Sequence, residues 1–170
     1  MGTFAFENPT FYCFSMLTFI QPATTEQIDV AREIFREYEK WLGLDLCFQS
    51  FEAEITDLPG EYVLPDGRLY LVYADEKLAG CVALRKLDAD ICEMKRLFVR
   101  DRFRGQKIGV ALIKQVIDDA REIGYKYLRL DTFPAKMGKA VSLYEAHGFR
   151  QIDPYYDNPF AGVLFMELSL

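Results

Sequence analysis

The segment from Lys95 to Lys107 carries a large share of the positive charge of the chain. It holds six of the 20 basic residues of a protein whose net charge is −6, and these are Lys95, Arg96, Arg100, Arg102, Arg104 and Lys107. Basic side chains directly before a helix attract anions by their charge. The first backbone N–H groups of the helix add hydrogen-bond donors, because they have no acceptor within the helix. Gly105 lets the backbone curl so that several N–H groups point into one concavity. This pattern predicts a site for an anionic group such as a pyrophosphate.

A basic surface loop that caps a helix is the alternative for this segment, and charge alone does not decide between the two. The expected position of the segment between a strand and a helix favours the ligand site. Gly109 also favours it, because a missing side chain one turn into the helix leaves room for a ligand. A nucleotide P-loop is disfavoured, since the segment lacks the GxxxxGK(S/T) motif.

Hydrophobic periodicity predicts the elements that position this segment. The expected helices cover residues 24–43, 50–58, 107–123 and 139–147. The expected strands cover residues 16–20, 69–74, 78–84, 91–99, 127–132, 150–152 and 163–168. Residues 91–132 then form a β-α-β unit, whose two strands are expected to be parallel. The simplest architecture for this order is one α+β domain.

The domain is expected to span residues 16–170, with residues 1–15 as an N-terminal extension outside the core fold. A chain of 170 residues with 51% hydrophobic content can bury a sizeable core. Residues 1–20 have neither a basic start nor a run of about 18 apolar residues. We therefore expect neither a signal peptide nor a membrane helix.

Composition also narrows the expected partners and cofactors. The negative net charge argues against nucleic acid as the main partner. The four cysteines form no CxxC pair and His147 is the only histidine, so no metal site is expected. Cysteines in apolar runs suit a reducing cytoplasm. The sequence leaves the oligomeric state open, and its edge strands are compatible with a homodimer.

Two motifs resemble the GNAT (Gcn5-related N-acetyltransferase-like) superfamily of acetyltransferases. The acetyl-CoA loop of that family has the motif (R/Q)xxGx(G/A), where x is any residue. Residues 104–109 match it at Arg104 and Gly109, whereas Lys107 stands at the customary Gly. The second motif, AxxLYExxGF, is matched in full by residues 140–149. The resemblance runs from about Met16 to Leu170 and implies an α+β fold: a mixed, mostly antiparallel sheet with a splayed parallel strand pair, flanked by four helices.

The resemblance implies acetyl-CoA as the co-substrate. Its pantetheine arm would pair with the strand backbone of Leu97, Phe98 and Val99. Its pyrophosphate would take N–H groups from the loop and the first helical turn, at Arg104, Gly105, Gln106, Lys107, Ile108, Gly109 and Val110.

Acyl transfer to an amine needs a base near neutral pH and benefits from an acid near the departing thiolate. Glu93 is the candidate base, because several family members carry a catalytic Glu four residues before the position of Leu97. The alternative is a strand Glu that faces solvent or pairs with Arg96. Tyr144 is the candidate acid, since it matches the family Tyr that approaches the CoA sulfur. The alternative is an ordinary core aromatic.

The acceptor is expected to be a small-molecule amine, or one that resembles an amino acid. In this superfamily the first helices and the last strands line the acceptor pocket. The candidate contacts are Tyr38, Arg96, Tyr155, Tyr156 and Asp157, with Trp41 and Phe51 as further wall candidates. The alternatives are core positions for the helical aromatics and a simple turn for residues 155–159.

The sequence thus predicts an N-acetyltransferase that moves an acetyl group from acetyl-CoA to a primary amine by direct attack in a ternary complex. The first alternative is a non-catalytic acyl-CoA-binding sensor. Lys107 and Met137 favour it, because Met137 stands where the family often has an Asn. The second alternative is an interaction domain that does not bind CoA.

Overall fold

The computed structural model describes residues 16–170, apart from the side chain of Phe48, and the expected extension at residues 1–15 lies outside the described residues. The strands are β1 (Leu17–Ile20), β2 (Arg68–Ala74), β3 (Lys77–Lys86), β4 (Ile91–Val99), β5 (Tyr127–Thr132), β6 (Arg150–Ile152) and β7 (Leu164–Ser169). The α-helices are α1 (Thr25–Leu42), α2 (Phe51–Asp57), α3 (Ile108–Ile123) and α4 (Pro134–Ala146). Short 3-10 helices are η1 (Cys47–Gln49), η2 (Gly60–Tyr62) and η3 (Asp101–Phe103).

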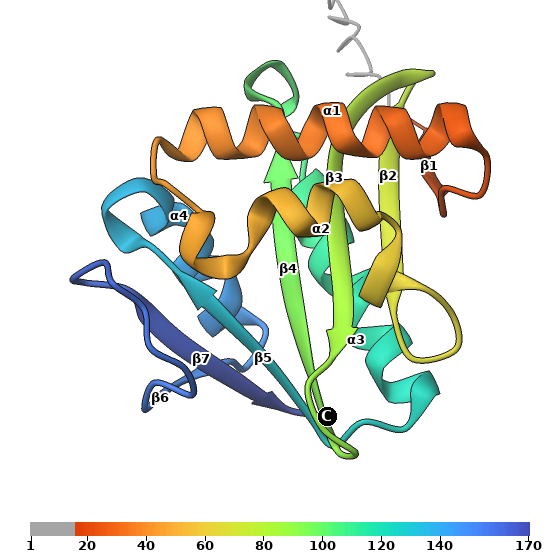
Figure 1. The fold of residues 1–170 in the computed structure, drawn as a ribbon. Helices are drawn as coiled ribbons and strands as arrows, with labels where there is room; N and C mark the ends of the chain where they lie inside the picture. Colours follow the sequence, from red (N-terminus) through yellow and green to blue (C-terminus); the bar gives the residue numbers. More distant parts are fainter. Residues whose placement is uncertain (1–15) are drawn as a thin grey trace, which may run out of the picture.

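The described strands form one sheet in the order β1-β2-β3-β4-β5-β7-β6. All neighbouring strands are antiparallel except β4 and β5. Helices α1 and α2 cover one face of the sheet, and α3 lies on the other (Figure 1). The expected α+β class, with a mostly antiparallel sheet and one parallel pair, is therefore confirmed.

Helix α1 begins and ends where its sequence predicts. The Thr24 hydroxyl accepts the Gln27 backbone N–H at 3.3 Å, and the Gln27 side chain accepts the Thr24 N–H, which makes the capping box. Gly43 ends the helix in the left-handed conformation, with φ of 67°. The apolar stripe of α1 packs on the face of the sheet that also carries α2.

Helix α4 starts one turn earlier than expected. Its periodic apolar residues begin only after a break at Met137, where φ is −119° and ψ is 26°. Pro134 lies in the first turn, where its fixed φ suits a helix start. The sequence pattern therefore revealed the second part of α4 and missed the first.

Strands β4 and β5 pair only at their beginnings, where Ile91–Glu93 lies opposite Tyr127–Arg129. Beyond these residues the two strands diverge, as Figure 1 shows. A bulge in β4 contributes, because Cys81 and Ala83 of β3 lie opposite Phe98 and Lys95. Within this bulge the backbone of Arg96 adopts a positive φ of 56°, so the chain turns within the strand. The splay leaves the end of β4 without a partner on the β5 side.

Candidate active site

A groove of about 710 Å³ runs along the free end of β4. The loop before α3 and the helix α4 form its other walls. All the expected cofactor contacts except Gln106 line it, namely Leu97, Phe98, Val99, Arg104, Gly105, Lys107, Ile108, Gly109 and Val110. Trp41, which was expected beside an acceptor, also lines this groove.

The start of α3 presents backbone N–H groups to the groove. The N–H of Ala111 donates to the carbonyl of Lys107, so the N–H groups of the preceding helical residues have no acceptor within the helix. Arg104 differs from the expectation, because its N–H donates to the Asp101 carbonyl at 3.1 Å. Available donors therefore begin at Gly105, one residue later than the motif implied.

The side chain of Arg104 is also held by its neighbours. Its Nε donates to the Val99 carbonyl at 3.1 Å, and its guanidinium lies 2.8 Å from Asp101. The same group lies 4.7 Å from the centre of the Trp41 ring. Arg104 thus fixes the loop against β4 and α1, and it brings Trp41 to the mouth of the groove.

Lys107 lies at the N-cap of α3 in the left-handed conformation, with φ of 61° and ψ of 13°. Glycine adopts this conformation without steric cost, whereas other residues are strained there. The backbone of this loop therefore has the shape that the customary Gly would give it. The structure accommodates Lys107 by strain at one residue and keeps its exposed side chain on the rim of the groove.

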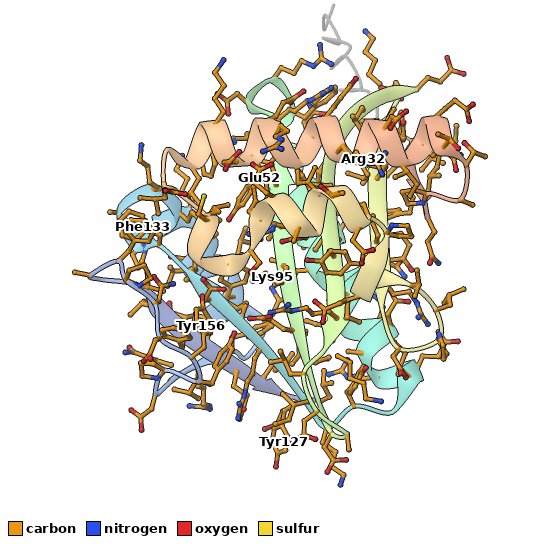
Figure 2. All side chains as sticks on the ribbon, viewed as in Figure 1. Arg32, Glu52, Lys95, Tyr127, Phe133 and Tyr156 are labelled. Carbon is orange, nitrogen blue, oxygen red and sulfur yellow. The ribbon has the colours of Figure 1, made fainter. Side chains whose placement is uncertain are left out.

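A second, smaller cavity of about 50 Å³ lies where β4 and β5 diverge. Leu97 and Met137 line both this cavity and the groove, so the two spaces meet at these residues. The polar residues in its wall are Tyr38, Gln49, Lys95, Arg96, Asp131, Thr132, Tyr144 and Asn158. Figure 2 shows Lys95 below α2, with Tyr156 and Phe133 on the side towards β5 and β7.

Tyr144 lies in the wall of this cavity. Its side chain is 3% exposed and packs against the ring of Phe149. Burial raises the pKa of Tyr144 far above its ordinary range, and the nearby Tyr38 and Asp131 add to the effect. The phenol therefore stays protonated at neutral pH and can act as a hydrogen-bond donor.

Glu93 lies outside both spaces but close to the smaller one, because its carboxylate is 3.9 Å from the Nζ of Lys95 in the cavity wall. Its carboxylate is 0% exposed and lines neither the groove nor the cavity. Its Oε2 accepts the Nε–H of Arg85 at 2.8 Å, and its Oε1 accepts the Tyr155 hydroxyl at 2.7 Å. The partner is Arg85 on the adjacent strand, not Arg96. Both oxygens of the Glu93 carboxylate are therefore engaged by other side chains of the protein. Its role as a base stays a prediction.

Arg96 lines the cavity, but its guanidinium is already bound. Its Nε and NH2 groups donate to the two carboxylate oxygens of Glu54 at 2.9 and 2.5 Å, and NH1 donates to Gln49 at 3.0 Å. The rings of Tyr38 and Phe51 flank the group. Arg96 thus joins β4 to α1 and α2, and Glu54 occupies the place that a substrate carboxylate would need.

The tyrosines of the last loop support the cavity from outside. Tyr155 packs against Phe165 and donates to Glu93. The Tyr156 hydroxyl accepts hydrogen bonds from Gln49 at 3.0 Å and from Asn158 at 3.1 Å. None of the expected contacts Tyr155, Tyr156 and Asp157 lines the cavity, whereas Tyr38 does.

The polar cavity residues that the sequence reasoning missed include Gln49, Lys95 and Asp131. Gln49 sits in the short helix η1, and its amide connects Lys95, Arg96 and Tyr156. Asp131 had a usable signal, because it lies near the carboxyl end of a strand in a parallel pair, where ligands often bind. Lys95 had none, since its side chain reaches the cavity beside a bulge that periodicity does not reveal.

The described residues contain neither a candidate metal-binding cluster nor a candidate membrane-spanning helix. Residues 16–170 contain no cluster of at least three His, Cys, Asp or Glu side chains that could bind a metal ion. In the same range, each helix is too short or too polar to span a bilayer.

Known proteins share both the sequence pattern and the fold. The sequence model of the acetyltransferase (GNAT) family matches residues 28–149. An uncharacterized N-acetyltransferase of Schizosaccharomyces pombe is 37% identical, over 85% of this chain and 90% of its own length. One of Dictyostelium discoideum is 35% identical, over 85% of this chain and 95% of its own length.

Among solved structures, the PaiA N-acetyltransferase of Thermoplasma acidophilum, crystallised in complex with coenzyme A, has a TM-score of 0.70 at 20% identity. The match covers 91% of this chain and 99% of that one, and it shows the shared fold. The family match spans well over half of the chain and includes the groove loop and Tyr144. The chain therefore belongs to the GNAT family of acetyltransferases.

Proposed function

We propose that this protein transfers an acetyl group from acetyl-CoA to the primary amine of a small acceptor. The observation that carries the proposal is the meeting of two different spaces at Leu97 and Met137. The larger space suits an elongated anionic cofactor, and the smaller one has a polar wall that contains Tyr144. A thioester that reaches the junction would face an acceptor held in the smaller space.

Acetyl-CoA would be held by backbone groups along one side of the groove. The pantetheine amides would pair with the unpaired edge of Leu97–Val99, much as a neighbouring strand would. The pyrophosphate would accept N–H groups from Gly105 to Val110 at the positive end of α3. Lys107, Lys136 and Lys139 add positive charge to the walls. The fold shared with a relative that was crystallised with coenzyme A supports this placement.

Direct transfer within a ternary complex accounts for the chemistry. The amine nitrogen forms a bond to the acetyl carbon as the carbon–sulfur bond breaks, and Tyr144 hydrogen-bonds or protonates the departing thiolate. A covalent acetyl-cysteine route has no support among the three described cysteines, because none lines either space. Burial also raises the pKa of the Cys92 thiol to about 12, which leaves little thiolate at neutral pH.

Acetyl-CoA binding followed by turnover tests this function. At a concentration 100-fold above Kd, acetyl-CoA is expected to raise Tm by about 5 °C or more. Product formation across a panel of amines, followed by mass spectrometry, would then identify the acceptor class. Failure of acetyl-CoA to stabilise the protein would contradict the proposal. Stabilisation without turnover on a broad panel would favour the sensor.

Substitutions at Lys107 separate backbone strain from charge. We expect Lys107→Gly to have a free energy of unfolding about 1 kcal/mol higher than Lys107→Ala, because only Gly relieves the left-handed strain. Both variants lose the same charge, so both are expected to bind acetyl-CoA about 2- to 5-fold more weakly than the wild type. Denaturant titration and isothermal calorimetry measure the two effects. Unequal losses of affinity would show that the backbone of the loop, and not the charge, controls binding.

A further inference from the structure

The wall of the smaller cavity contains two opposite charges that do not form an ion pair with each other. Lys95 of β4 and Asp131 of β5 both line it. No ion pair within 4 Å joins these two side chains, although many charged residues in the described part of the chain are paired. A cavity with a separate cation and anion is complementary to a ligand that carries both charges.

Lys95 is a buried cation with spare hydrogen-bonding capacity. Its side chain is 6% exposed, and its Nζ donates to the Gln49 side-chain carbonyl at 3.2 Å. Glu93 lies 3.9 Å away and is itself bound by Arg85 and Tyr155. An ammonium group has three donors, so at least one remains for a ligand. Burial lowers the pKa of Lys95, and a bound anion would oppose this shift by stabilising the charged form.

Asp131 is the carboxylate on the β5 side of the cavity. It lies beyond the paired part of β4 and β5 and lines the smaller cavity. No Lys, Arg or His of residues 16–170 forms an ion pair with it, in contrast to Glu54 and Glu93. Its charge contributes to the raised pKa values of Tyr38, Tyr144 and Tyr156. A cationic amine in the cavity would therefore find a carboxylate that has no cationic partner among the described side chains, near Tyr144 and Tyr156.

We propose that the acceptor is an amino acid, or a small molecule of the same charge pattern, with its carboxylate bound by Lys95 and its amine beside Asp131. This inference rests on the proposed function and names the substrate class of the same site. It assigns the anchoring role to Lys95, because the guanidinium of Arg96 is occupied by Glu54. It also makes Asp131 the first acceptor of the amine proton, whereas Glu93 is engaged elsewhere.

The proton balance of the step follows from this arrangement. Asp131 takes one proton from the ammonium group, and the neutral amine attacks the acetyl carbonyl as the thiolate departs. The second amine proton passes to the sulfur by way of Tyr144, which donates its own proton and is reprotonated. Asp131 then releases its proton to water. The products are the N-acetyl compound, coenzyme A and one proton.

Matched acceptor pairs test the inference on the wild-type protein. Each amino acid is compared with its decarboxylated amine and its carboxamide, with acetyl-CoA as donor and product formation measured by mass spectrometry. We expect kcat/KM to be about 10- to 100-fold higher for the amino acid, because the other two compounds offer the buried ammonium of Lys95 no carboxylate besides Glu93, which lies 3.9 Å away and is held by Arg85 and Tyr155. Equal or better turnover of the decarboxylated amines would overturn the inference while leaving the proposed function intact.

Lys95→Met adds a test of the anchoring residue. It is expected to raise KM for amino acids about 10- to 100-fold and to leave the KM of the decarboxylated amines within about 2-fold. Lys86→Met is the control, because Lys86 is an exposed lysine of the same sheet that pairs with Asp66 at 3.3 Å. Equal losses for both acceptor types would show a structural role and overturn the assignment. If Lys95→Met does not fold, the comparison of acceptors on the wild-type protein still tests the inference.

The two proposals fail in different ways. If acetyl-CoA does not stabilise the protein and no amine is acetylated, the proposed function fails and the inference falls with it. If amines are acetylated without any preference for a carboxylate, only the inference fails. Asp131→Asn is expected to lower kcat for all acceptors, since every amine must lose a proton, and an unchanged kcat would remove Asp131 from the step.

Discussion

Tyr144→Phe is expected to lower kcat about 100-fold or more while acetyl-CoA affinity stays within about 2-fold of the wild type. Phenylalanine retains the buried ring and its contact with Phe149, so the fold and the groove stay intact. The variant lacks only the hydroxyl, which would stabilise the thiolate as it departs. Because that interaction forms only late in the reaction, its loss falls on kcat and not on cofactor binding.

The pH dependence of the wild type should follow from the same residue. Burial and neighbouring charge raise the pKa of Tyr144, so its acid form persists throughout the neutral and mildly alkaline range. The rate is therefore expected to show no alkaline fall from Tyr144 below pH 10, the ordinary pKa of a tyrosine. A loss of activity near pH 8 that disappears in Tyr144→Phe would contradict this.

Tyr125→Phe is the matched control for the hydroxyl deletion. Tyr125 is also buried, at 6% exposed, and its hydroxyl donates to the Asp66 carbonyl at 2.9 Å, outside both the groove and the cavity. We expect it to cost stability, on the order of 1 kcal/mol for the lost hydrogen bond, without changing kcat. If Tyr144→Phe retains the wild-type rate, Tyr144 has no part in the mechanism.

Gly109→Val is expected to weaken acetyl-CoA binding by about 100-fold or more. A Cβ at this position would meet only Leu143 Cδ1, at 3.9 Å, so the folded chain can accommodate a side chain. That side chain would project into the groove beside the N–H groups that begin α3. The cost therefore falls on the ligand, which is displaced from close contact with the backbone. Calorimetric titration with acetyl-CoA measures it.

Lys114→Val is the control that separates obstruction of the groove from the low helix propensity of valine. Lys114 is 71% exposed on the solvent face of α3, where its ion pair with Asp118 contributes about 0.5 kcal/mol or less. Both variants place a β-branched residue in the same helix, and only Gly109→Val obstructs the groove. Unchanged acetyl-CoA affinity in Gly109→Val would show that the cofactor does not approach α3 at this residue.

Much of the fold could be predicted because its signals are local. The capping box at Thr24 and Gln27, the apolar stripe of α3 and the turn glycines each act within a few residues, so the sequence shows them directly. Helix α4 was only partly visible, because its kink at Met137 interrupts the periodicity. The parallel pairing of β4 and β5 was predicted from the β-α-β unit, and the structure confirms it.

The sequence by itself determined the loop before α3, the helix that follows it and the placement of Tyr144 on α4, because short motifs specify these features. Only the tertiary structure decided which charged residues are available at the site. Glu93 and Arg96 are bound by Arg85 and Glu54, partners that sequence spacing does not reveal. The bulge in β4 brings Lys95 to the cavity, and the splay of β5 exposes Asp131 opposite it. The physical reason is that an ion pair depends on three-dimensional proximity between distant segments, whereas a motif depends on neighbours along the chain.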